Sequence, residues 1–115
     1  MTGDLVPGSV VWVTLDPTVG REQSGRRPAV VVSSRDYLDV VDQLAVVVPV
    51  TRVNRGWPNH IRLDGSDLPA ESWAMTEQLR TVARDRIAGS AGQVSASTLA
   101  EIRLWIADFL DLAPA

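Results

Sequence analysis

Short runs of β-branched and apolar residues, separated by turn-forming residues, follow one another along most of the chain. Such runs predict strands, and we expect them at Ser9–Leu15, Pro28–Ser34, Leu44–Thr51, His60–Leu63, Ser72–Thr76 and Leu79–Val82. The last part of the chain instead has apolar residues at helical spacing, namely Leu99, Ile102, Ile106, Phe109 and Leu110. This order predicts a mainly β fold, a small barrel or sheet of short antiparallel strands with a C-terminal amphipathic helix packed on it.

The segments between the expected strands contain residues that turn or end regular structure. We expect loops at Asp16–Arg26, Arg52–Asn59 and Asp64–Leu68, and a bend at Glu77–Gln78. Short helical turns are expected at Arg35–Val41, capped by Ser33 or Ser34, and at Ala83–Ala88, ended by Gly89.

Two further positions bear on how the elements end or pair. Pro49 has no N–H for a sheet ladder, so we expect an edge or a bulge in its strand. At the C-terminal helix, Thr98 and Glu101 fit a capping box, while Ser95 and Ser97 are alternative caps.

The length and the lack of cysteine exclude several classes of protein. A chain of 115 residues predicts one domain, residues 1–115. Without cysteine there is no disulfide scaffold, thiol catalyst or iron–sulfur cluster, and a single histidine argues against a multi-histidine metal site. We therefore expect neither a metal nor a cofactor.

The apolar stretches are too short to span a membrane and Met1–Pro7 does not resemble a signal peptide, so we expect a cytoplasmic protein.

The cations of this acidic chain are all arginine. The net charge is −3, yet each of the 11 basic residues is an arginine. Genomic base composition is one explanation, and recognition of phosphate by guanidinium groups is the other. Three arginines cluster at Arg21, Arg26 and Arg27, and three more lie in the acid-free segment Thr51–Arg62. Such local basic segments can hold a polyanion despite the net charge.

Several short motifs occur in a fixed order along the chain. They are Asp16-Pro17-Thr18, Gly20-Arg21-Glu22-Gln23, Gly25-Arg26-Arg27-Pro28, Val48-Pro49-Val50-Thr51, Gly56-Trp57-Pro58 and Glu77-Gln78-Leu79-Arg80-Thr81. In this order and spacing the sequence resembles the MazF/PemK (Kid) family of toxins, from about Gly8 to Leu112.

The resemblance implies a fold, an activity and partners. It implies an SH3-like barrel that forms a homodimer and acts as the toxin of a type II toxin–antitoxin module. Such toxins cleave single-stranded RNA at short sequences without a metal, usually leaving a 2′,3′-cyclic phosphate and a 5′-hydroxyl, and so inhibit translation and growth. A MazE-type antitoxin inserts an acidic tail across the RNA site. Carried over by motif, the catalytic residues are Arg27 and Thr51, with Glu22 and Gln23 on the loop before them.

The chain also departs from the family pattern. Some PemK-type members have an arginine two places before the acid of the late acid–Gln motif, where this chain has Met75, so an acid–arginine dyad is absent. Arg21 stands where relatives often have serine or histidine, and Arg26 occupies a variable position. These differences concern the RNA contacts, where we expect Arg21 and Arg26 to act as phosphate clamps.

Attack by the neighbouring 2′-hydroxyl needs a base, stabilisation of the phosphorane and a proton for the leaving oxygen. Arg27 can hold two non-bridging oxygens, and a guanidinium pKa above about 12 favours electrostatic stabilisation over proton donation. Thr51 offers a hydroxyl donor. Glu22 is the candidate base, as the carboxylate of the loop, and Glu77 is its rival; an ion pair with a nearby arginine is the alternative role for each.

Other polar and aromatic side chains are candidates for RNA binding. They are Arg21, Gln23, Arg26, Arg52, Asn54, Arg55, Trp57, Asn59, His60, Glu77 and Gln78. Trp57 either stacks on an unpaired base or packs its loop onto the barrel. His60 contacts RNA, transfers a proton or is structural. Trp12, Trp73 and Trp105 lie in regular elements, so we expect core or dimer packing for them.

Two alternatives to a ribonuclease stay open on this fold. One is a non-enzymatic poison of DNA gyrase, and the other is an inert barrel used as a binding module. Gyrase-inhibiting relatives act through a tryptophan-containing C-terminal tip, whereas this chain ends Leu112-Ala113-Pro114-Ala115 and keeps Arg27 and Thr51. Both features favour the ribonuclease.

Overall fold

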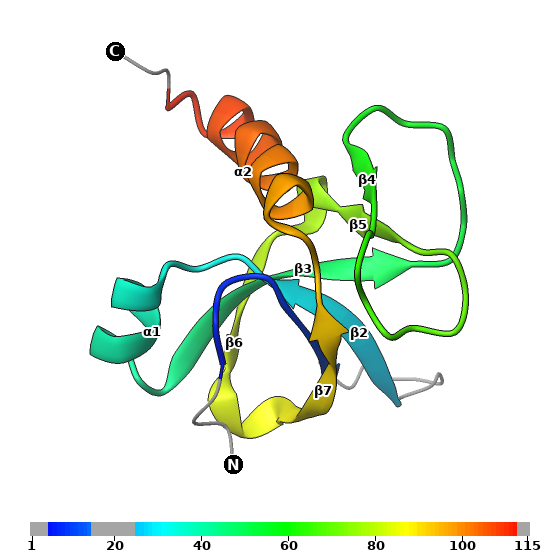
Figure 1. Cartoon of the computed structure of the whole chain (residues 1–115). Helices are drawn as coiled ribbons and strands as arrows, with labels where there is room; N and C mark the ends of the chain where they lie inside the picture. The colour runs from blue at the N-terminus through cyan, green and yellow to red at the C-terminus, as the bar shows by residue number, and fades with distance from the viewer. Residues whose placement is uncertain (1–4, 15–24, 113–115) are drawn as a thin grey trace, which may run out of the picture.

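The computed structural model describes residues 5–14 and 25–112 (Figure 1). Along the chain, the elements are β1 Ser9–Thr14, β2 Arg26–Val31, α1 Arg35–Val40, β3 Leu44–Thr51, β4 His60–Arg62, β5 Trp73–Met75, η1 Thr76–Gln78, β6 Arg80–Ala83, η2 Arg84–Arg86, β7 Ile87–Gln93 and α2 Ala96–Phe109. The expected mainly β fold with a C-terminal helix is confirmed.

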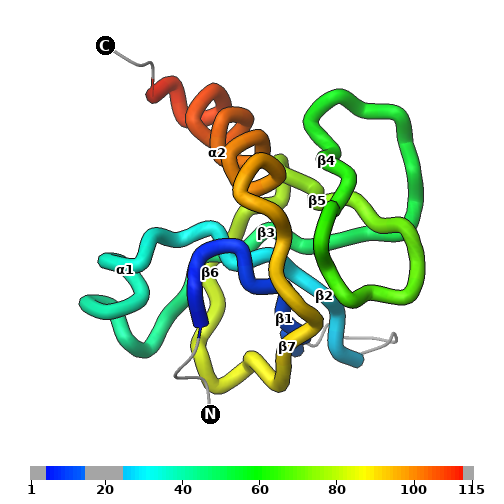
Figure 2. Tube along the Cα trace, viewed as in Figure 1, coloured from blue at the N-terminus to red at the C-terminus, as the bar shows by residue number. Residues whose placement is uncertain are grey.

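The strands form one curved antiparallel sheet. Its order is β4-β5-β3-β2-β1-β7, and β6 pairs with β3 outside this path. The ladder does not close into a barrel within the described residues, because β7 pairs with β1 and β6 with β3 while η2 joins the two. Figure 2 traces the chain through this sheet and out along α2, whose C-terminal end projects away from the strands.

Strand β3 holds the sheet together because it has three partners. It pairs with β2 on one side, and on the other with β6 over Leu44–Val47 and with β5 at Val50 and Thr51. Pro49 falls between these two partners. The edge expected at Pro49 is therefore local. β3 is an interior strand, and it changes its partner from β6 to β5 around Pro49, the residue that lacks an N–H.

Alternate residues of the strands face two separate cores. Val10, Val30 and Val48 belong to the core that α2 covers with Ile102. The residues next to them in sequence, including Val11 and Val31, belong to the second core together with α1. The period of two typical of strands thus gives each valine-rich strand two buried faces.

The N-terminal cap of α2 is Ser95. Its Oγ accepts a hydrogen bond from the Thr98 N–H at 3.2 Å, so the expected capping box at Thr98 is wrong and the alternative at Ser95 is confirmed. Ile102 is fully buried, but Phe109 and Leu110 are 46% and 55% exposed. The last turn of α2 extends past the sheet, which explains their exposure (Figure 1).

Strand β7 is the element that the sequence did not predict. The expected helical turn shrinks to η2, and Gly89 does not end it but lies within β7. The apolar signal is weak because β7 has β1 as its neighbouring strand, with register shifts, and otherwise only a bridge from Gly92 to Ser66 among the described residues; much of β7 is exposed. Gly92 has a φ of +91°, and a Cβ there would come within 2.9 Å of the Asp67 backbone nitrogen. Glycine at this position allows the segment after β4 to approach β7.

Candidate nucleic-acid interface

A cleft of about 700 Å³ opens where the start of β2 and the end of β3 lie beside the segment before β5. It is lined by Arg26–Pro28 of β2, Val50–Val53 at the end of β3, Leu68–Ala70 and Ser72 before β5, and Trp12 of β1. Arg27 and Thr51, the expected catalytic pair, are therefore both in this cleft, together with Arg26 and Arg52.

The register of the sheet explains why Arg27 and Thr51 meet. Ala29 of β2 pairs with Pro49 of β3 in antiparallel register. Continuing this register by two residues along each strand brings Arg27 opposite Thr51. The pair is thus positioned by regular backbone structure.

Hydrogen bonding prepares the Thr51 hydroxyl to act as a donor. The Val53 N–H donates to Thr51 Oγ1 at 3.1 Å. Since this bond uses a lone pair of the hydroxyl oxygen, the hydroxyl hydrogen stays available to an anion in the cleft.

The rim of the cleft is cationic. Arg26, Arg27 and Arg52 are all exposed, and the described lining residues include no carboxylate. An arginine-rimmed cleft with a neutral hydroxyl donor suits a phosphodiester, because guanidinium groups match the geometry of phosphate oxygens.

Sequence reasoning missed two parts of the lining. Trp12 was expected in core or dimer packing, and it does pack against the core that α2 covers, but it also lines the cleft. Leu68–Ala70 carried no functional signal at all. The spacing of apolar residues along a strand does not show which end of the strand borders a cleft. Only the three-dimensional structure shows that Trp12 and Leu68–Ala70 line it.

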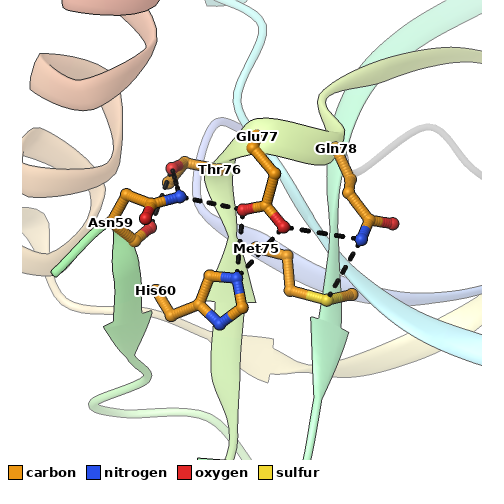
Figure 3. Close-up of polar contacts among 6 residues, drawn as sticks. All are labelled: Asn59, His60, Met75, Thr76, Glu77 and Gln78. Atoms are coloured by element: carbon orange, nitrogen blue, oxygen red, sulfur yellow. Dashed lines mark hydrogen bonds and ion pairs between the residues drawn. The ribbon is translucent and has the colours of Figure 1, made fainter. Parts of the chain in front are cut away.

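A second polar cluster lies at β4 and η1, and Figure 3 shows its members. His60 Nε2 lies 3.0 Å and 3.1 Å from the two carboxylate oxygens of Glu77. Asn59 Nδ2 donates to Glu77 Oε1 at 2.9 Å, and the Thr76 hydroxyl donates to the Asn59 carbonyl at 2.7 Å. The structure therefore joins three candidate RNA-binding residues, Asn59, His60 and Glu77. His60 and Glu77 do not line the cleft of Arg27 and Thr51.

The protonation states of this pair follow from its surroundings. Burial alone raises the pKa of Glu77, but hydrogen bonds from His60, from its own backbone and from Gln78, with the charge of His60, lower it overall. Glu77 is therefore ionised, and the His60 nitrogen that faces it, Nε2, carries the proton. His60 Nδ1 is buried and makes no hydrogen bond within the described residues.

The loop of residues 52–59 presents aromatic and cationic groups beside this cluster. The rings of Trp57 and His60 are 4.7 Å apart between centroids, tilted by 49°, and the Arg55 guanidinium lies 5.6 Å from the Trp57 ring. Trp57 is 49% exposed, so one part of it packs and another part is open to a ligand. Stacking of Trp57 on an unpaired base stays a prediction. Asn54 Oδ1 accepts the Gly56 N–H at 3.0 Å and shapes the turn before it.

Residues 7–110 match the family described as PemK-like, MazF-like toxin of type II toxin-antitoxin system. The chain belongs to this family. It is 35% identical over 97 residues to the endoribonuclease toxin MazF of Escherichia coli K12, covering 84% of this chain and 85% of that protein. It is 34% identical over 112 residues to endoribonuclease MazF9 of Mycobacterium tuberculosis, covering 91% and 95%.

Solved MazF structures have the same fold. A chain in a crystal structure of MazE-MazF from Deinococcus radiodurans superposes with a TM-score of 0.80 at 30% identity, covering 95% of this chain and 97% of that one. A crystal structure of MazF from the same organism gives 0.75 at 33% identity, covering 94% and 99%.

Part of the family's motif set has no described position here. Arg21, Glu22 and Gln23 lie outside the described residues. At the position of the dyad arginine of some PemK-type members, the Met75 sulfur accepts a contact from Gln78 Nε2 at 3.6 Å. Among residues 5–14 and 25–112, no three potential metal ligands group together, and no helix is long and apolar enough to cross a membrane.

Proposed function

We propose that this MazF-like chain is a sequence-specific endoribonuclease toxin that cuts single-stranded RNA by attack of the neighbouring 2′-hydroxyl, without a metal. The products are a 2′,3′-cyclic phosphate and a 5′-hydroxyl, and the consequence is inhibition of translation and growth. Family membership supports the toxin class, and the names of the Escherichia coli and Mycobacterium tuberculosis relatives support the endoribonuclease activity.

The observation that carries the proposal is the presence of Arg27 and Thr51 in one arginine-rimmed cleft. In this position the Arg27 guanidinium can engage both non-bridging oxygens of one phosphate, and the Thr51 hydroxyl can donate to the same group. Charge on the phosphorane grows during attack, so donors fixed before the reaction stabilise the transition state more than the ground state.

We assign the role of general base to Glu22. Its rival Glu77 already accepts hydrogen bonds from His60 and Asn59. Although burial raises the pKa of Glu77, the bond and charge of His60, with hydrogen bonds from its own backbone and Gln78, hold it below the ordinary value. A general base works best when its pKa is close to the operating pH, so the surroundings of Glu77 suit binding of RNA better than proton transfer.

The partners follow from the same cleft. We propose a cytoplasmic homodimer neutralised by a MazE-type antitoxin whose acidic tail competes with RNA for the arginines at the rim. Support comes from the Deinococcus radiodurans relative, which was crystallised as MazE-MazF, and from the lack of a carboxylate among the described lining residues.

The decisive experiment incubates purified protein with single-stranded RNA in excess EDTA and maps the 5′-hydroxyl ends. We expect discrete cuts that persist in EDTA and disappear when the scissile nucleotide is a 2′-deoxynucleotide. Arg27→Ala should abolish the cuts, whereas Arg35→Ala, an exposed arginine on α1 outside the cleft, should keep them. Uncut RNA combined with inhibition of DNA supercoiling by gyrase would replace the ribonuclease with the gyrase poison.

A further inference from the structure

Trp12 is the aromatic residue of the cleft, and the proposed chemistry does not use it. It lies on β1 opposite Pro28 of β2, is half-buried, and packs on one side against the core that α2 covers. Because it also lines the cleft beside Arg27 and Thr51, part of the indole is available to a ligand there.

The same cleft also has an apolar wall. It consists of Leu68, Pro69 and Ala70, which precede β5. Two hydrogen bonds hold the wall at its ends: the Asp67 N–H donates to the Ala91 carbonyl at 2.8 Å, and the Ser72 hydroxyl donates to the Ala70 carbonyl at 2.8 Å. The close approach of Asp67 to Gly92 fixes the same segment on β7. The wall is therefore a preformed surface.

We propose that Trp12 and this wall form a stacking site for one unpaired base of the RNA, the base attached to the nucleotide whose phosphate lies between Arg27 and Thr51. The inference rests on the proposed ribonuclease function and adds a base site to it. A nucleotide has a flat base and an anionic phosphate, and the lining of the cleft contains one aromatic side chain, Trp12, together with three arginines. A volume of about 700 Å³ is within the range of sites that enclose small ligands.

The lining also indicates how this site treats different bases. Its apolar members are Trp12, Pro28, Val50, Val53, Leu68, Pro69 and Ala70, and the hydroxyl of Ser72, which follows the wall, already donates to the Ala70 carbonyl. Stacking tolerates every base because each has a π face, whereas base identity is read by hydrogen bonds to base edges. We therefore expect this position of the RNA to need a base and to accept any of the four.

The test is a double-mutant cycle on binding of a non-cleavable 2′-O-methyl oligonucleotide that contains the sequence cut by the wild-type protein. Each nucleotide around the scissile phosphate is replaced in turn by an abasic one. For the wild-type protein, one adjacent position should lose about 5- to 150-fold in affinity, the range for loss of one base–aromatic stack. In Trp12→Leu the same abasic change should cost almost nothing, and Trp12→Phe should restore its effect.

Trp105→Leu is the matched control, because Trp105 is also half-buried against the same core but lies on α2 outside the cleft. It should keep the full abasic effect. Equal abasic effects in wild type and Trp12→Leu would overturn the inference, as would a Trp12→Leu defect seen only with an acidic antitoxin peptide. If Trp12→Leu does not fold, the abasic scan of the wild-type protein decides. The site is refuted if the scan finds no position of the RNA that needs a base and accepts all four. Failure of the ribonuclease proposal is distinct, since wild-type protein would then cut no RNA.

Discussion

Replacing Arg27 with alanine should remove activity while leaving the fold intact. Arg27 is exposed at the start of β2, and surface substitutions of this kind change the free energy of unfolding by less than about 0.5 kcal/mol. The loss of one preorganised donor to a developing anion costs about 3–4 kcal/mol in the barrier, a factor of hundreds to thousands in kcat. Arg27→Lys should recover only part of this, because an ammonium group cannot make the two parallel bonds of a guanidinium.

The neighbouring Arg26 is the matched control for this prediction. Arg26 lines the same cleft, but continuing the β2–β3 register places it opposite Arg52, whereas Arg27 lies opposite Thr51. Arg26→Ala should therefore weaken RNA binding and reduce the salt slope of single-strand binding by about 0.7. It should retain much of the rate at saturating RNA.

Two measurements on the same protein samples check this difference. Single-turnover cleavage at saturating RNA gives the rate of the chemical step, and binding of a 2′-O-methyl oligonucleotide across a salt series gives the slope. Similar losses of single-turnover rate in Arg27→Ala and Arg26→Ala would refute the argument from strand register. An Arg27→Ala variant that cleaves normally once saturated would refute the catalytic role itself.

Three further predictions concern stability and pH. The pKa of Glu77 is lowered from 4.5 in the folded protein. Ionised Glu77 therefore stabilises the fold above pH 4.5, and this contribution is lost as the pH falls below that value. The difference in unfolding free energy between wild type and Glu77→Gln should shrink as the pH is lowered from about 7 to about 3. Gly92→Ala should lower the free energy of unfolding in urea by about 2 kcal/mol or more, from a positive φ and a backbone clash, whereas Gly89→Ala, in open space, should stay within about 1 kcal/mol of wild type. Ser95→Ala should cost about 1 kcal/mol through loss of the α2 cap, and Ser97→Ala should cost much less if Ser95 is the cap.

The fold was largely predictable from the sequence because most elements have strong local signals. The valine-rich strand Leu44–Thr51 and the helical turn capped by Ser34 occur where they were expected. Strand β7 was not predictable, because Gly89 and Gly92 are unfavourable in strands and the extended backbone there is stabilised by pairing with β1 and by the bridge to Ser66. Glycine is needed at position 92 because Asp67, which is distant in sequence, lies close to it. Local strand propensity gives no information about such a contact.

The candidate site was predictable only in part. The family motifs indicated Arg27 and Thr51, and the structure gives a physical reason for their proximity in the β2–β3 register. Sequence reasoning treated His60 and Glu77 as separate candidates, whereas the structure joins them as one hydrogen-bonded pair. Trp12 was assigned to packing because a strand residue shows only alternation, and its place at a cleft depends on residues that lie far along the chain.

The antiparallel pairing of β2 with β3 separates what must stay constant in this molecule from what is free to diverge. A slip of one residue between these strands would turn Arg27 to the opposite face from Thr51, so a single insertion or deletion in either strand should abolish cleavage even in a folded protein. Segment 52–59 connects β3 to β4, and segment 63–72 connects β4 to β5 and bridges β7 at Ser66; neither sets that pairing. Lineages can therefore replace both segments, and with them the RNA sequence that is recognised, while one inherited reaction persists.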